Sequence, residues 1–372
     1  MEILISFIIP FIILLTIVVF IHEYGHYYFA RKYGVGVTDF SIGFGKELFG
    51  FNDKSGTRWK FCAIPLGGYV KFFGDRNVFS QAEQEQLLKE YSEEDREKLF
   101  VVKPIYQRSL IVAAGPFANF LLAIVIFAFI YMFAGKDFTP AKIQEVQLES
   151  PAYVAGIKSG DVIQSINNRE VKSIMEVSTF INASSSETID VQVLRDGIEL
   201  TLKVKPKFIE GKDSLGNEIN KKIIGIKVAP LNEEINSQRL GPATALFYAI
   251  KETWFVIEAS WEFVISMFKG TGDTSQLGGP IKIAKITGQV AKFGIVAFLS
   301  IMAYISISLG FINLFPIPML DGGHLMFYAF EKILGRPLSQ KTQEGFFRIG
   351  LFLLLSLMFF TTFNDLKDLG LF

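Results

Sequence analysis

The stretch HEYGH at residues 22–26 comes directly after an uncharged apolar run that covers residues 3–20. On a helix, His22 and His26 lie one turn apart on one face, with Glu23 beside them. This HExxH pattern is typical of a zinc site in which two neutral imidazoles bind the metal and a carboxylate acts as general base. Ionisable residues are costly inside a membrane and are usually functional there. The pattern therefore predicts a metal-dependent hydrolase whose site lies in or just below a membrane span.

Half of the 372 residues are hydrophobic, and four long apolar stretches stand out. A helix needs roughly 20 apolar residues to cross a bilayer. The stretches predict four transmembrane helices, at residues 3–20, 109–135, 293–320 and 349–364, the last extended back to 345. We interpret the first as a retained span, because no basic region precedes it and cleavage there would remove the HExxH site.

Basic residues in the loops predict how these spans are oriented. They follow the first span, precede the second, and lie between the third and the fourth: Arg31, Lys32, Lys103, Arg108, Lys332, Arg336, Lys341 and Arg348. The positive-inside rule makes that side cytoplasmic. The N-terminus, the long segment 136–292 and the C-terminus are then outside, and the HExxH site lies towards the cytoplasmic end of its span.

The overall composition excludes nucleic acid as a partner and limits the kinds of cross-link and metal site that the chain can form. The 37 basic and 37 acidic residues balance, and no basic run is present, so nucleic acid is not expected as a partner. The single cysteine, Cys62, excludes an intrachain disulfide and the cysteine-rich zinc sites. A bound metal must therefore be held by His and Asp or Glu, and we expect no small-molecule cofactor.

Residues 38–74 are rich in glycine and contain alternating apolar runs, which predicts short β-hairpins. Because this aromatic segment follows the HExxH helix, we expect it to dip back into the membrane, where irregular backbone needs protein or a water-filled cavity beside it. The alternative is a cytoplasmic β-hairpin at the membrane surface. Residues 81–98 are rich in Glu and Lys and predict a solvated surface helix without a chemical role.

Residues 140–230 predict a soluble α+β domain. Its predicted elements are a strand at 163–166, a turn at Asn167-Asn168, a helix at 173–183, and strands at 188–194 and 198–204 around the hairpin signal Asp196-Gly197. Together with the sequence AGIKSGD, this order resembles a PDZ domain of the type found in bacterial membrane and envelope proteases. PDZ domains bind peptide ends as an added strand. The alternative is a small packing domain without a ligand.

Residues 241–268 are apolar and aromatic, but Lys251, Glu258 and Glu262 share one helical stripe. This favours an amphipathic helix in the membrane interface over a fifth span. A loop rich in Gly, Thr and Ser follows at residues 270–280.

The third span ends in NLFPIPMLDGGH, residues 313–324. Pro316 and Pro318 cannot continue a helix, so we expect the chain to become extended where Asp321 appears in an apolar setting. Asp321 is therefore our candidate for the third zinc ligand. Two imidazoles and one carboxylate leave a position open for water, as in catalytic zinc sites. Glu23 would take a proton from water and pass it to the leaving amine.

Neighbouring residues have competing interpretations. His324, the third histidine of the chain, competes with Asp321 for the role of ligand: both could bind the metal, or His324 could lie behind the site or pack beside it. Asn313 could pack between helices or hydrogen-bond the substrate backbone, and we favour the second. A substrate helix has its amides paired internally and must unwind locally before it is cut. A groove beside Pro316 and Pro318 would offer replacement partners, so these two prolines and Asn313 are predicted to bind substrate.

With both motifs in place, the chain resembles the site-2 protease family, specifically the bacterial RseP-type intramembrane zinc metalloproteases. The resemblance rests on HEYGH at 22–26, GFG at 43–45, PLGGY at 65–69, AGPFAN at 114–119, the PDZ-like insert and NLFPIPMLDGG at 313–323. HExxH alone is a weak signal, but HExxH with NxxPxPxLDGG in a separate span is highly specific. One departure is the single PDZ-like unit, where several members carry two in tandem.

The resemblance implies that His22, His26 and Asp321 bind one Zn²⁺ and that Glu23 is the base. It implies cleavage of single-span proteins within the bacterial inner membrane, usually after another protease has shed the outer domain. The implied substrates are transmembrane anti-sigma factors and remnant signal peptides. The periplasmic PDZ-like domain would exclude uncut proteins by size.

The predicted fold is a polytopic α-helical membrane protein with four transmembrane helices, a membrane-associated β-hairpin segment and an inserted periplasmic PDZ-like α+β domain. The predicted parts are a first span with HExxH (1–30), a β segment with a charged helix (31–107), a second span (108–135), the PDZ-like domain (136–232), an interfacial helix and loop (233–292), a third span (293–330), and a cytoplasmic loop with the fourth span (331–372).

Two other classes of protein compete with the protease hypothesis. A catalytically inactive scaffold would be expected to have lost Glu23 or a metal ligand, and the sequence keeps all of them. A zinc transporter would need several polar residues along its spans, whereas these spans are almost uncharged away from the two motifs.

Overall fold

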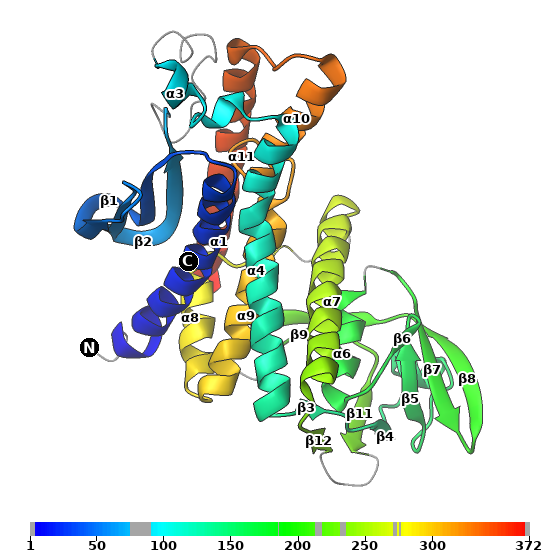
Figure 1. Ribbon diagram of the computed structural model, residues 1–372. Helices are drawn as coiled ribbons and strands as arrows, with labels where there is room; N and C mark the ends of the chain where they lie inside the picture. The colour runs from blue at the N-terminus through cyan, green and yellow to red at the C-terminus, as the bar shows by residue number, and fades with distance from the viewer. Residues whose placement is uncertain are drawn as a thin grey trace. The chain divides into compact units, whose positions relative to one another are not determined.

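The computed structural model describes residues 4–74, 91–184, 186–212, 218–230, 236–270, 274 and 277–368. The chain forms two compact units, the first comprising Met1–Ile126 and Gly279–Phe363 and the second comprising Phe127–Gly278 and Asn364–Phe372. Helix α4 (Ile105–Phe133) begins in the first unit and ends in the second (Figure 1).

Among the described residues, four helices are long and apolar enough to cross a membrane, and they coincide with the four predicted spans. They are α1 (Ile9–Lys32), which a π-helical segment at Leu4–Ile8 precedes, α4, α9 (Ile295–Asn313) and α11 (Gln340–Asp368). Apolar side chains of α11 point outward: Phe352 is 70% exposed and Phe359 is 75% exposed. Such a surface is unfavourable in water and suits contact with lipid tails.

Glycines allow the helices of the first unit to approach each other closely. A Cβ atom at Gly25 of α1 would overlap the main-chain carbonyl of Ala114 in α4. Gly310 of α9 lies against the same helix, where a Cβ would come 2.9 Å from the carbonyl oxygen of Pro116. Small residues are common where membrane helices cross, because they let the two backbones pack tightly. Helices α1 and α9 therefore meet α4 at one short segment.

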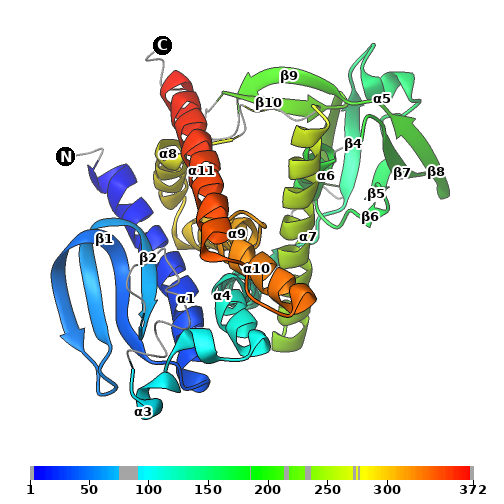
Figure 2. The same ribbon diagram turned by 90° about the horizontal axis from the view of Figure 1, so that it is seen from above.

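An antiparallel pair of strands, β1 (Val37–Asn52) and β2 (Arg58–Phe72), follows α1 and lies beside it (Figure 2). Bulges bend both strands, so the first half of β1 pairs with both halves of β2, and the second half of β1 pairs with the first half of β2. Strands form where the sequence predicts them, but as two long bent strands that fold over each other instead of several short hairpins. Their place relative to the membrane stays a prediction.

One carboxylate holds the turn between these two strands. Asp53 accepts hydrogen bonds of 2.7–3.0 Å from side chains of Tyr27, Ser55 and Trp59 and from the main-chain N–H groups of Ser55 and Thr57. Burial alone would raise the pKa of Asp53, but these bonds hold it well below its usual range. Tyr27 belongs to the HExxH helix, so the turn is attached to that helix.

Two helices that the sequence patterns did not predict flank α9. Helix α8 (Pro280–Ala291) precedes α9, and α10 (Asp321–Leu334) follows it. Helix α8 packs on the start of α1, where a Cβ at Gly288 would come 2.7 Å from the Cα of Phe7. The expectation of only one helix and a loop across residues 233–292 was therefore incomplete. Most of the predicted charged helix at 81–98 lies outside the described residues, and α3 (Glu93–Arg96) occupies part of the rest.

The second unit contains the predicted α+β domain, whose strand order is β11-β4-β5-β7-β8, with β6 paired to β5. The elements are β4 (Ala141–Val146), α5 (Pro151–Val154), β5 (Val162–Ile166), β6 (Arg169–Glu170), α6 (Ile174–Ala183), β7 (Ile189–Arg195), β8 (Ile198–Val204) and β11 (Ile226–Pro230). Both predicted turns form, and Asn167, Asn168 and Asp196 have the positive φ that two-residue hairpins of this kind need. Two ribbons accompany the sheet: β9 (Lys207–Lys212) with β10 (Glu218–Ile223), and β3 (Lys136–Asp137) with β12 (Ser237–Gln238).

Two glycines and one ion pair determine the backbone conformation of the segment AGIKSGD. Gly156 and Gly160 have φ of 83° and 93°, a conformation that residues with a side chain rarely adopt. The buried carboxylate of Asp161 accepts two hydrogen bonds from Arg195, at 2.7 and 2.8 Å, and one from the N–H of Lys158. Burial would raise the pKa of Asp161, but these bonds hold it below its usual range.

Helix α7 (Pro242–Phe268) forms where the amphipathic helix was predicted, and part of its charged stripe binds the α+β domain. Arg169 lies 3.1 Å from Glu258 and 2.9 Å from Glu262. Beside them, the rings of Phe180 in α6 and Phe255 in α7 pack with centroids 5.1 Å apart. The stripe therefore has protein partners, and the location of α7 in the membrane interface stays a prediction.

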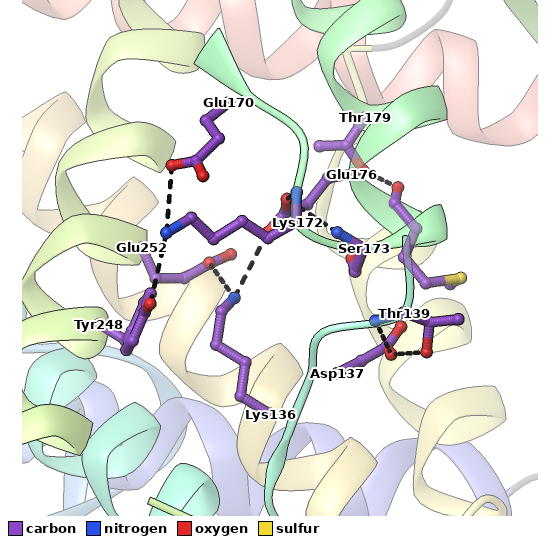
Figure 3. Close-up of polar contacts among 11 residues, drawn as sticks. Lys136, Asp137, Thr139, Glu170, Lys172, Ser173, Glu176, Thr179, Tyr248 and Glu252 are labelled. Atoms are coloured by element: carbon purple, nitrogen blue, oxygen red, sulfur yellow. Dashed lines mark hydrogen bonds and ion pairs between the residues drawn. The ribbon is translucent and has the colours of Figure 1, made fainter. Parts of the chain in front are cut away.

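A second group of polar contacts joins α7 to the same domain (Figure 3). Lys136 lies between two carboxylates, 3.4 Å from Glu176 of α6 and 3.8 Å from Glu252 of α7. The ammonium group of Lys172 donates a hydrogen bond of 3.4 Å to the hydroxyl of Tyr248. Helix α7 therefore has polar contacts with the domain through both Arg169 and Lys136.

Candidate active site

Helix α1 presents two imidazoles on one face, as the spacing predicts. The ring centroids of His22 and His26 are 4.9 Å apart, and their Nε2 atoms approach to 3.3 Å. His22 is 7% exposed and Glu23 is 8% exposed. All three side chains are thus placed by a single helix.

Asp321 reaches the same point from another part of the chain. Its Oδ2 lies 3.2 Å from Nε2 of His22, and its Oδ1 lies 3.5 Å from Nε2 of His26. Asp321 is the first residue of α10, where a negative charge is stabilised by the helix dipole. The structure therefore brings together the three residues that were predicted as metal ligands.

The connection from α9 to Asp321 is compact, so the expectation of an extended chain was wrong. The N–H of Leu320 donates to the carbonyl of Ile317 at 3.0 Å, which closes a turn over Pro318 and Met319. Proline in second place and a residue of positive φ in third place define a type II turn, and Met319 has φ of 92°. The fixed φ of proline favours this turn, and the next α-helix begins directly after it.

The donor set fits a zinc ion. Two ligand atoms held about 2.0–2.1 Å from a tetrahedral zinc are about 3.3–3.4 Å apart. The separations between the three donors, 3.2, 3.3 and 3.5 Å, agree with that value. Within the described part of the chain, Oδ2 of Asp321 is buried and has no hydrogen-bond partner. A cation between these atoms would satisfy it, and three protein ligands leave a fourth position open.

Helix α4 supports the imidazoles from behind. Nδ1 of His26 lies 2.9 Å from the main-chain carbonyl oxygen of Ile111, and Nδ1 of His22 lies 3.3 Å from the side-chain amide of Asn119. Between them, a Cβ at Gly115 would overlap Nε2 of His26. Sequence reasoning noticed this part of α4 only through the family resemblance, because nothing in its spacing predicts a partner for a histidine.

Strand β2 covers the side chain of Glu23. A Cβ at Gly68 would come 3.0 Å from Cγ of Glu23 and 2.9 Å from Cγ1 of Val19. Only glycine at this position leaves room for the carboxylate side chain. The β segment thus borders the candidate site.

The other predicted residues lie around the α9–α10 connection. Asn313 is the last residue of α9 and is half-buried, Pro316 is exposed and Pro318 is buried. The ring of His324 lies 6.4 Å from that of Phe327 and 5.8 Å from that of Phe347. Among the described residues, the convergent donor set consists of His22, His26 and Asp321 without His324.

Comparisons with known proteins agree with this chemistry. Residues 10–357 match the sequence profile of Peptidase family M50. A Mesorhizobium japonicum protein named as a zinc metalloprotease, mll0638, is 42% identical over 96% of this chain and 98% of its own length. The protein Atu1380 of Agrobacterium fabrum, also named as a zinc metalloprotease, is 42% identical over 98% and 96%. Metalloprotease MmpA of Caulobacter vibrioides is 36% identical over 96% and 94%.

A comparison of structures found the PDZ domain of the SdrC-like protein Lmo2051 from Listeria monocytogenes. The two share 20% sequence identity with a TM-score of 0.20, and the match covers 24% of this chain and 88% of that domain.

Proposed function

Because this chain is a zinc metalloprotease of peptidase family M50, the site-2 protease family, we propose that it hydrolyses peptide bonds within transmembrane segments of single-span proteins. The observation that carries the proposal is the position of the donor set. The two histidines and Glu23 lie on α1, which is a candidate membrane span. Asp321 follows α9, a second candidate span, after a connection of seven residues. A substrate of this site must therefore approach from within or beside the bilayer.

The geometry of the site supports a role for each of its residues. We assign His22, His26 and Asp321 as the ligands of one zinc ion and Glu23 as the general base. When bound, zinc lowers the pKa of a water molecule and polarises the scissile carbonyl. Glu23, shielded under Gly68, takes the proton of the attacking water and transfers it to the leaving amine.

Substrate binding is assigned to the α9–α10 connection and the β sheet. A transmembrane helix must unwind locally before its carbonyl can be attacked, and the freed amides then need new partners. Asn313 and Pro316 are proposed to contact such a strand, which is supported by the position of Asn313 at the end of α9 and by the exposure of Pro316. Pro318 is buried, so its part is to hold the turn that delivers Asp321.

The biological setting is proposed from the resemblance and the loop charges. The protein would be a multi-pass protein of a bacterial inner membrane, with its termini and the PDZ-like domain in the periplasm. Its site would lie towards the cytoplasmic side. Its substrates would be anti-sigma factors or remnant signal peptides in regulated intramembrane proteolysis, and the PDZ-like domain would exclude proteins that are not yet shortened.

The test is cleavage in a defined membrane. Purified wild-type protein and Glu23→Gln are reconstituted in lipid vesicles with a set of single-span peptides that carry helix-destabilising residues. We expect cleavage within the span by wild type and none by Glu23→Gln, with equal zinc content in the two proteins. Cleavage by both would exclude Glu23 as the base. Cleavage by neither, with all peptides, would favour the scaffold hypothesis.

A further inference from the structure

The two histidines that we assign as zinc ligands have different partners on their outer nitrogens. Nδ1 of His26 faces the carbonyl oxygen of Ile111, which can only accept a hydrogen bond. Nδ1 of His22 faces the side-chain amide of Asn119, which carries an acceptor and a donor. The inference below rests on the proposed zinc site.

The partner of Nδ1 decides whether Nε2 can bind a metal. Neutral imidazole carries one proton, so Nε2 offers a lone pair only when Nδ1 holds that proton. A hydrogen-bond acceptor at Nδ1 stabilises this tautomer and orients the ring. For His26 the main chain supplies the acceptor. For His22 the candidate within hydrogen-bond distance is Asn119.

The surroundings of Asn119 fix where its amide lies. The residue is fully buried in α4, and its main-chain carbonyl accepts a hydrogen bond of 2.9 Å from Ser306 of α9. Its Nδ2 lies 3.3 Å from Nδ1 of His22, and its Oδ1 is buried without a hydrogen-bond partner among the described residues. A half turn of the amide exchanges these two atoms and leaves the shape of the side chain unchanged. In either orientation one amide atom faces a place without a partner among the described residues, so the surroundings allow the amide oxygen to face Nδ1 of His22.

We propose that Asn119 is a positioning residue that turns its amide oxygen to Nδ1 of His22 and holds this histidine in the zinc-binding tautomer. Asn119 does not touch the metal or the substrate. It acts through His22, and its contribution is an acceptor at a fixed point of α4. An amide supplies this acceptor without placing a charge among membrane helices.

Two variants of similar shape test whether the hydrogen-bond acceptor of Asn119 matters beyond the space that its side chain fills. Asn119→Leu removes both hydrogen-bonding atoms, whereas Asn119→Asp keeps an acceptor on either side. The matched control is Thr287→Val, which changes another buried polar residue of the first unit, on α8. Each full-length protein is purified in detergent, and its zinc affinity is measured by competition with a chelator.

We expect Asn119→Leu to bind zinc about 10- to 100-fold more weakly than wild type, which is the usual cost of losing a partner of a metal-binding histidine. Asn119→Asp should recover most of that loss, and Thr287→Val should match wild type. Loading with Co²⁺ gives a second measurement, because the visible spectrum reports the ligand geometry and should change in the Leu variant and return in the Asp variant. If Asn119→Leu does not fold, Asn119→Ala takes its place.

Wild-type affinity in the Leu or Ala variant would overturn the proposal, as would an Asp variant as weak as the Leu variant. Failure of the zinc site itself gives a different result. In that case His22→Ala would bind zinc as tightly as wild type. If His22→Ala loses zinc while Asn119→Leu keeps it, the site stands and only the role of Asn119 is rejected.

Discussion

Glycine serves different physical purposes in the membrane helices and in the PDZ-like domain. In the helices, Gly25 and Gly115 are needed because a side chain would collide with a neighbouring helix or with the imidazole of His26. In the domain, Gly156 and Gly160 have open space around the position of a Cβ, but they adopt a left-handed backbone. Aspartates differ in the same way: Asp321 lies beside two imidazoles in the candidate site, whereas Asp161 holds a loop. The same residue type therefore predicts chemistry in one region and architecture in the other.

The largest effect is expected at Asp321. Asp321→Ala should lose zinc, and with it several kcal/mol of transition-state stabilisation, so cleavage should fall by about 1000-fold or more. Zinc content by elemental analysis and cleavage in vesicles measure the two effects. Tight zinc binding that persists in the variant would remove Asp321 from the ligand set.

Gly115→Ala comes next and tests the space beside the imidazoles. Alanine is the better helix former, but its Cβ would overlap His26, so we expect zinc affinity and activity to fall by about 10- to 100-fold. Gly345→Ala in α11 is the matched control, because a Cβ there meets none of the described atoms within 4 Å. That variant should keep zinc and gain up to about 1 kcal/mol of stability. Equal behaviour of the two variants would show that packing at Gly115 does not matter.

Asp161→Asn should lower the stability of the PDZ-like domain by about 2 kcal/mol, because Arg195 loses a charged partner. Zinc affinity and intrinsic cleavage should not change. The pKa of Asp161 is lower in the folded domain than in the unfolded chain, so its stabilisation is complete above about pH 4 and is lost as the pH falls through the folded pKa. Hydrogen exchange of the domain in the intact protein, followed from pH 7 downward, measures both effects. A wild-type acid profile in the variant would contradict this assignment.

The smallest effect is expected at Arg169, which joins the domain to α7. Arg169→Gln removes ion pairs to Glu258 and Glu262, and partly exposed pairs of this kind contribute about 1 kcal/mol or less. Hydrogen exchange in α7 should rise slightly, and the rise should be masked at high salt, where the wild-type pairs are screened. A large loss of protection would mean that these pairs, and not the packing of Phe255, hold α7.

The features that the sequence predicted correctly have local causes. Four apolar runs, two hairpin turns and the HExxH spacing each depend on residues within one short window. Asp321 was singled out from its own surroundings, because a carboxylate shortly after two prolines in an apolar segment is unusual, and the structure places it beside both histidines. The family resemblance then connected the two motifs, which the spacing alone could not do.

The features that were missed depend on contacts between distant residues. The partner of His22 is 97 residues away on α4, and the partners of Arg169 lie beyond 80 residues on α7. Helix α8 was missed because its twelve residues are too short and mixed to stand out beside a membrane span. The type II turn was missed because Met319, unlike glycine, gives no sign of a left-handed backbone.

The attachment of the β sheet to α1 has a mechanical consequence. Tyr27 donates a hydrogen bond to Asp53 in the turn, and Gly68 packs against Glu23, so the sheet contacts the HExxH helix at two separate points. These two contacts couple the position of the sheet to that of the helix. If a substrate peptide paired with this sheet, its register on the sheet would determine which of its peptide bonds lies beside Glu23.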